Sequence, residues 1–308
     1  MVDAVRERQG MAKSRHQEAR GRPAQRRPAS DAPSPVRRGS TGHKAMQQRH
    51  TARRRLLLPL SAAGLVLAVV FGLVVASLSS GGASATAGGV GAAPTTVVTE
   101  VTTLTPSVLS RIGAGQAATS LQPVPTGSPL SIDGKPGVVF VSEESCPFCA
   151  AERWPVVIAL SHFGTWRNLG ATTSSSTDVY PSTATFSFRH ATFTSPDLSL
   201  RTTELTNNVG HPLQPLTQLD NNLLARYDVP PYINNSDQSG SVPFLDIDNH
   251  DVLAGAQYDP QVLAGLSMSQ IAAQLKDPAS PVAKAIDGSA NVLIASINQV
   301  LHAPASQP

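Results

Sequence analysis

The two cysteines of the chain lie three residues apart, in the sequence Cys-Pro-Phe-Cys. They are Cys146 and Cys149, and the 308 residues contain no others. An apolar, β-branched run at 138–141 precedes them and good helix formers follow, so the pattern predicts a strand, a turn and a helix N-terminus with Pro147 in its first turn. Unpaired backbone N–H groups at such a terminus stabilise a thiolate. We therefore expect Cys146 to be the nucleophile of disulfide exchange and Cys149, on the same helix face, to be the resolving thiol.

The same two cysteines have two other interpretations. They could form a static structural disulfide, or they could supply half of a zinc site. A tetrahedral zinc site needs about four ligands, and the sequence has no second cysteine pair and no histidine within ten residues of the motif. We therefore predict no metal and no organic cofactor, and the structural disulfide stays open as an alternative.

The residues around the motif resemble the thioredoxin superfamily. The resemblance rests on the apolar strand before the motif, on the Cys-Pro-aromatic-Cys centre and on Pro155 further along the same helix. More narrowly, the run S-C-P-F-C-A-A-E-R-W at 145–154 looks like an actinobacterial, membrane-anchored family called domain of unknown function 929, a likeness that extends from about residue 137 to the C-terminus. The resemblance implies an α/β domain with the thioredoxin-like fold, in which helices flank a central mixed sheet.

The resemblance also singles out Val242 and Pro243. The superfamily places a cis-proline at the start of the strand that faces the dithiol, and Pro243 has the matching place in the chain order. A cis bond would expose the Val242 backbone to an incoming peptide; an ordinary trans proline at a strand start is the alternative. The residues that the resemblance implies for substrate binding are Pro147, Phe148, Val242 and Pro243.

One position departs from the superfamily pattern. Thioredoxins carry a buried acid six residues before the first cysteine, where this chain has Phe140. Glu143, Glu144 or Glu152 could replace that acid only if its side chain pointed inward. We expect these glutamates to be exposed, and their negative charge to raise the pKa of Cys146.

The N-terminal part of the chain differs in composition from the rest. Residues 1–55 carry 15 Lys and Arg against 4 Asp and Glu, with almost no large apolar residues, which predicts a disordered basic tail. Residues 56–78 carry no charge and could span a ~30 Å hydrocarbon core as a helix. Because the arginines lie on its N-terminal side, the tail should stay in the cytoplasm. A signal peptide cleaved after residue 85 is the competing interpretation, but the apolar stretch is longer than an ordinary signal sequence.

We therefore expect a single-pass cell-membrane protein in which a linker at 79–94 leads to an extracytoplasmic domain at 95–308. The segment 170–215 is long for a minimal thioredoxin fold and suggests an insertion. Periodicity and turn residues predict the elements of the domain. We expect strands at 95–105, 130–132, 138–141, 184–188, 191–193, 199–205, 244–247 and 252–253, helices at 106–118, 147–163, 216–227, 261–275 and 281–301, the last interrupted near Gly288, and a loop at 170–178.

Together these features predict a membrane-anchored, extracytoplasmic thiol–disulfide oxidoreductase. Its partners would be thiols and disulfides of cell-envelope proteins, because such chemistry has substrates in an oxidising compartment. The alternative is a non-enzymatic envelope scaffold or binding protein with a static disulfide between Cys146 and Cys149, since a fold does not imply a function. We expect no nucleic-acid partner, although a third interpretation makes the basic tail 1–55 a binding segment.

Overall fold

The computed structural model describes residues 89–114, 117, 121–233 and 240–303. The predicted tail at 1–55 and the predicted membrane helix at 56–78 lie outside this part of the chain. Among the described residues, no helix is both long and apolar enough to cross a membrane.

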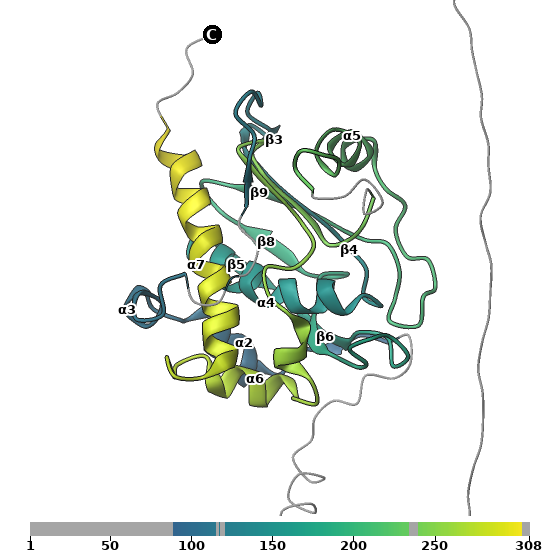
Figure 1. Cartoon of the computed structure of the whole chain (residues 1–308), viewed down its shortest axis with the longest axis vertical. Coiled ribbons are helices and arrows are strands. Elements are labelled where there is room, and N and C mark those ends of the chain that lie inside the picture. The colour runs from purple at the N-terminus through teal and green to yellow at the C-terminus, as the bar shows by residue number, and fades with distance from the viewer. Residues whose placement is uncertain (1–88, 115–116, 118–120, 234–239, 304–308) are drawn as a thin grey trace, which may run out of the picture. The chain divides into compact units, whose positions relative to one another are not determined.

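A mixed β-sheet forms the centre of the domain (Figure 1). Its middle strand, β4, pairs in parallel with β9 and antiparallel with β10. Strand β10 pairs with β11, which in turn pairs with β2, and β3 pairs with the start of β4. The strands are β2 (Gln122–Pro123), β3 (Ser131–Ile132), β4 (Lys135–Ser142), β9 (Ser199–Glu204), β10 (Phe244–Ile247) and β11 (Asp251–Ala254). The predicted mixed α/β architecture is confirmed.

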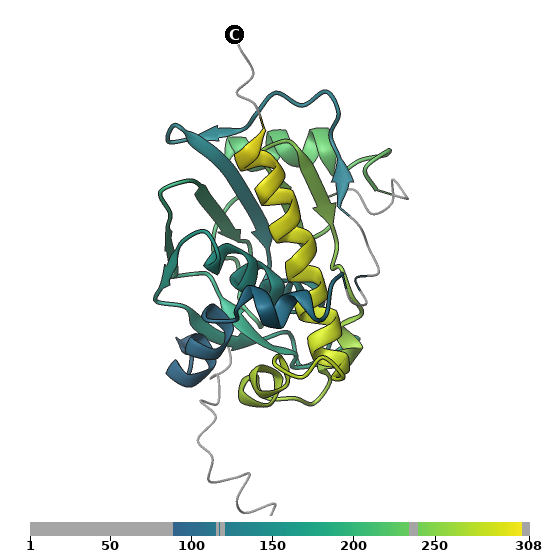
Figure 2. The same cartoon turned by 90° about the vertical axis from the view of Figure 1, so that its left-hand side faces the viewer.

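Helices cover both faces of this sheet. Helix α4 (Pro147–Ser161) and helix α7 (Pro281–His302) pack on one face, where the apolar side chains of alternate β4 and β10 residues meet them. Helix α5 (Gln218–Tyr227) packs on the other face through Leu223 and Tyr227. Figures 1 and 2 show α7 running along the first face, away from α5.

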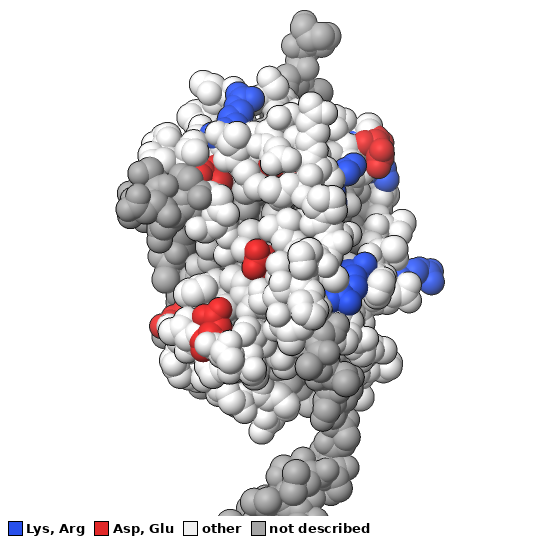
Figure 3. Space-filling view, turned by 90° about the vertical axis from the view of Figure 1, so that its right-hand side faces the viewer, with Lys and Arg blue, Asp and Glu red and all other residues white. Residues whose placement is uncertain are grey.

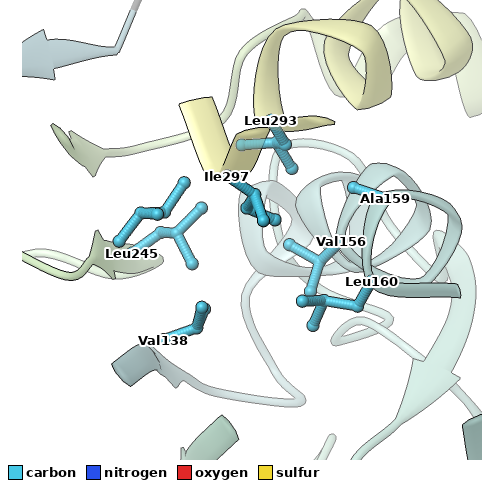
Figure 4. A pocket seen from close by; sticks show the side chains of 8 residues that line it. Val138, Val156, Ala159, Leu160, Leu245, Leu293 and Ile297 are labelled. Atoms are coloured by element: carbon cyan, nitrogen blue, oxygen red, sulfur yellow. The ribbon is translucent and has the colours of Figure 1, made fainter. Parts of the chain in front are cut away.

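The core between α4, α7 and the sheet is closely filled. The space left between these elements amounts to about 10 Å³, roughly the least that one water molecule needs. Its lining is entirely apolar and comes from β4, α4, β10 and α7 (Figure 4). This space is therefore a packing defect and not a ligand site.

The segment between α4 and β9, which overlaps the stretch 170–215 expected to contain an insertion, contributes strands to two small antiparallel sheets. One joins β1, β6 and β7, and the other joins β5 and β8. The predicted loop at 170–178 was therefore wrong in its first half, because these residues form β6 and pair with β1 and β7. The strands are β1 (Gly91–Ala92), β5 (Thr165–Arg167), β6 (Gly170–Thr173), β7 (Ala184–Ser187) and β8 (Thr192–Thr194).

The structure corrects two further expectations, one for residues 95–105 and one for the last helix. The predicted strand at 95–105 is helix α2 (Thr95–Thr102), whose buried Val97 and Val101 stand one helical turn apart. Helix α7 continues through Gly288 without interruption, since a single glycine costs only about 1 kcal/mol in a helix and this one lies in a buried face. The remaining helices are α3 (Pro106–Ser110), the 3-10 helix η2 (Pro260–Leu263) and α6 (Met268–Gln274).

Candidate functional site

Cys146 is the N-cap residue of α4, as predicted. Its sulfur accepts a hydrogen bond from the backbone N–H of Cys149 at 3.2 Å, and Pro147 occupies the first turn, where its missing N–H has no cost. The β4 strand leads into this turn through Glu143, whose N–H donates to the Cys149 sulfur at 3.5 Å. Strand and helix thus fix both sulfur atoms beyond the C-terminal end of β4, the middle strand of the sheet.

The two thiols differ in exposure and in acidity. Cys146 is half-buried and Cys149 is completely buried, and both are in the free thiol form. Hydrogen bonding from Cys149 lowers the pKa of Cys146, and the positive charge of Arg153 lowers it further, against the effect of burial. Burial raises the pKa of Cys149 well above its usual range, and the neighbouring Cys146 adds to the rise. The expectation of a raised Cys146 pKa was therefore wrong.

Val242 and Pro243 face the dithiol from the start of β10. The peptide bond between them is cis, as the resemblance implied. The Cys146 thiol donates a hydrogen bond to the Val242 carbonyl oxygen at 3.5 Å, and the Pro243 carbonyl accepts one from Gly255 at 2.7 Å. The backbone before β10 therefore lies directly beside the more accessible sulfur.

Phe148 separates the cysteines and is 40% exposed. Its ring meets that of Tyr180 edge-on, with centroids 5.8 Å apart. Tyr180 comes from the loop between β6 and β7, and Ser175 in the same loop donates its N–H to the carbonyl of Ser145 at 2.8 Å. The segment between α4 and β9 thus reaches the motif, a contact that no local signal in the sequence indicated.

A buried ion pair lies behind Cys149. Arg153 of α4 binds Glu204 of β9 through two nitrogens, at 3.1 Å and 2.6 Å, and also donates to the hydroxyl of Ser142 at 3.2 Å. Arg153, Glu204 and Ser142 are completely buried. The sequence interpretation assigned no role to Arg153, although its position four residues after Cys149 places it on the same helix face.

Two of the glutamates expected to be exposed are buried. Glu144 accepts hydrogen bonds from Ser187 and from Arg189, which is 2.9 Å away. Glu152 accepts one from the backbone of Gln257 at 3.0 Å, and burial raises its pKa to about 8. Glu143 alone of the three is partly exposed. The expectation failed because partners from distant segments bind these carboxyl groups, although Oε1 of Glu152 is buried without a hydrogen-bond partner among the described residues.

The described residues contain no group of three or more His, Cys, Asp or Glu side chains arranged to hold a metal ion. What the site offers is two sulfur atoms of different acidity, a backbone carbonyl beside one of them and a buried cation behind the other. This arrangement can support transfer of a disulfide between Cys146 and an incoming sulfur.

Of the comparisons with known proteins, the one with protein families finds a match. No curated protein and no solved structure matches the chain. The model of the family described as Domain of unknown function (DUF929) matches residues 126–299. This segment covers more than half of the 308 residues and includes the dithiol, Arg153 and Pro243, so the chain belongs to this family.

Proposed function

We propose that this chain is a membrane-anchored, extracytoplasmic thiol–disulfide oxidoreductase built on a thioredoxin-like fold. The observation that carries the proposal is the asymmetry of the dithiol at the start of α4. Cys146 is accessible and has a lowered pKa, whereas Cys149 is buried and has a raised one. A nucleophile and a protected resolving thiol need this division.

The order of the elements supports the proposed fold. After β4 and the dithiol helix α4, the chain forms β9 parallel to β4, then α5, then the Val242–Pro243 bond, the β10–β11 hairpin and α7. The resemblance to thioredoxins implied helix, loop, proline, strand, turn, strand and helix in this order. The segment 164–198 then stands as an insertion into that fold.

The proposed reaction exchanges one disulfide for another. The Cys146 thiolate attacks a substrate disulfide, which breaks, and the first substrate sulfur leaves as a thiolate and takes up a proton. Cys149 then loses its proton and attacks Cys146, which releases the second substrate sulfur with that proton. Two electrons pass to the substrate and a Cys146–Cys149 disulfide remains; the reverse sequence oxidises two substrate thiols.

Four residues would hold the substrate segment beside Cys146. The Val242 backbone, in front of Pro243, would pair with an extended peptide. The exposed ring of Phe148 would contact its side chains, and Pro147, which is buried, would shape the turn beside Cys146. In the face shown in Figure 3, acidic and basic side chains are few and scattered. None of the four residues that would bind the substrate carries a charged side chain, so apolar and backbone contacts would contribute more to binding than charge.

The proposal places the domain outside the cell membrane. The basic tail 1–55 would remain in the cytoplasm, 56–78 would be the single transmembrane anchor, 79–94 would link it to the domain, and 95–308 would be extracytoplasmic. Thiols and disulfides of cell-envelope proteins are the partners in this arrangement. Strand β1 at Gly91–Ala92 would tie the end of the linker to the domain.

A trapping experiment tests this function. Cys149→Ala in the full-length protein removes the resolving thiol, so a mixed disulfide between Cys146 and a partner should persist in acid-quenched cells. We expect additional bands on a non-reducing gel that disappear on reduction, and that are absent from the Cys146→Ala, Cys149→Ala double variant.

The opposite result favours the scaffold. If Cys149→Ala runs only as a monomer, and the wild-type pair stays oxidised under mild reductant, then the cysteines form a static disulfide. The domain would in that case be a non-enzymatic envelope protein.

A further inference from the structure

Arg153 is a buried cation, and its ion pair with Glu204 uses only two of the three guanidinium nitrogens. Its Nε and Nη2 atoms bind Glu204, and Nη2 also binds Ser142. The third nitrogen, Nη1, is buried and has no hydrogen-bond partner among the described residues. An unsatisfied donor on a buried charged group is costly, so a role beyond the ion pair would explain why it is present.

The position of Arg153 connects it with the dithiol. It follows Cys149 by four residues on α4, which puts both side chains on one helix face. Its guanidinium contacts Ser142, the last residue of β4, and the next residue, Glu143, donates its N–H to the Cys149 sulfur at 3.5 Å. Two consecutive residues at the end of β4 therefore contact the guanidinium and the buried sulfur: Ser142 binds Arg153, and Glu143 binds Cys149.

We propose that Arg153 is a positioning residue for disulfide exchange, which holds a fixed positive charge behind the dithiol and stabilises the thiolate forms of Cys146 and Cys149. This inference rests on the proposed function and adds to it a charged group near the dithiol, in a chain that has Phe140 where the superfamily has a buried acid. A buried carboxylate would disfavour a thiolate, whereas a guanidinium favours it.

The other charged groups around the dithiol leave this role to Arg153. Glu204 of β9 faces its Nε and Nη2 edge and holds it in place. Glu144 lies in the turn before Cys146 and pairs with Arg189, which follows β7, and its negative charge also raises the pKa of Arg153. Glu143, in the same turn, accepts a hydrogen bond from Ser145 and is partly exposed. In keeping with this, Arg153 lowers the pKa of both cysteines.

The test compares two variants that both lack the ion pair. Glu204→Gln keeps the cation, and Arg153→Met combined with Glu204→Gln removes it without leaving a buried carboxylate unpaired. The measurement is the rate of iodoacetamide alkylation of Cys146 against pH, in the reduced full-length protein in detergent, with the labelled residue located by mass spectrometry. Only two cysteines are present, so the label reports on the dithiol alone.

We expect the double variant to have a Cys146 pKa about one unit above that of Glu204→Gln, and so about tenfold slower alkylation at pH values below both. Its dithiol–disulfide equilibrium with glutathione should shift about tenfold toward the disulfide, which corresponds to about 30 mV. Equal pH profiles for the two variants would overturn the proposal.

A second comparison needs only the single variant. Since Glu204→Gln removes the anion that offsets Arg153, the Cys146 pKa should fall below that of the wild type, and an unchanged or higher pKa counts against the inference. Both measurements use thiol acidity and need no substrate. A failure here is therefore distinct from a failure to trap mixed disulfides, which concerns the proposed function itself.

Discussion

At the residue scale, the two cysteines have opposite environments although they are three positions apart. Cys146 lies half-buried at the open end of α4, where backbone N–H groups and Arg153 favour its thiolate. Cys149 lies within the first turn, where the protein excludes water and disfavours its thiolate. The local structure of the helix terminus therefore decides which sulfur reacts first.

This difference predicts selective alkylation. In the reduced protein at neutral pH, iodoacetamide should modify Cys146 at least about tenfold faster than Cys149, because only the exposed thiolate is a good nucleophile. The measurement is the mass of the motif peptide after timed quenching. In urea both residues should react at similar rates, and equal rates in the folded protein would contradict the assignment of Cys146 as the nucleophile.

At the scale of elements, helix α5 depends on a cap that also joins it to the sheet. Thr217 accepts a hydrogen bond from the N–H of Asp220 at 3.1 Å, and Asp220 accepts one in return from the Thr217 N–H at 2.8 Å. The hydroxyl of Thr203, on β9, also donates to Asp220 at 2.9 Å. The cap therefore fixes the start of the helix against β9.

Removing this cap should destabilise the domain. We expect Thr217→Ala to lower the free energy of unfolding by about 1 kcal/mol, the usual cost of losing an N-cap side chain, as measured by urea denaturation followed by tryptophan fluorescence. The control is Asn222→Ala, on the exposed side of the same helix, which should change stability by less than about 0.5 kcal/mol. Similar losses in both variants would show that the cap has no special role.

Elements with a strong local signal were predictable from the sequence. The apolar run of β4, the N-cap at Cys146 and the spacing of α5 all depend on near neighbours, and each was found. Helix α2 was not, because its Thr and Val residues suit a strand and only packing against α4 and α6 makes it helical. The strand β6 was missed for a similar reason, since its partners β1 and β7 come from distant parts of the chain.

The two cysteines of the site were predictable from the sequence, whereas its buried charged residues were not. Charged residues are usually exposed, so a sequence gives little reason to bury Arg153. Its partner Glu204 lies 51 residues further along the chain, and only the parallel pairing of β4 with β9 brings them together. The one available signal was the four-residue spacing between Cys149 and Arg153 in a helix that is mostly apolar.

At the scale of the whole domain, three buried carboxyl groups that take part in no ion pair among the described side chains have strongly raised pKa values. Burial raises the pKa of Glu152 and of Asp287 to about 8, and that of Asp246 to about 7. Glu152 and Asp287 belong to α4 and α7, whereas Asp246 belongs to β10. Both faces of the sheet therefore contain groups whose ionisation opposes folding.

These groups predict that stability depends on pH in a definite direction. A carboxyl group with a raised pKa in the folded state keeps its proton where the unfolded chain has lost it, so its stabilising contribution is complete below the unfolded pKa and is lost as the pH rises toward the folded one. For Glu152 this window runs from 4.5 to about 8, and each pKa unit is worth about 1.4 kcal/mol.

Glu152→Gln isolates one of these contributions, because glutamine cannot ionise and can still accept the hydrogen bond from Gln257. The variant should lose less stability than the wild type between pH 5.5 and pH 8.5, measured by urea denaturation at a series of pH values. Asp197→Asn, at an exposed position, should follow the wild-type curve. If Glu152→Gln also follows that curve, Glu152 is ionised in the folded domain at neutral pH, and the interface between α4 and the segment before η2 must then admit water.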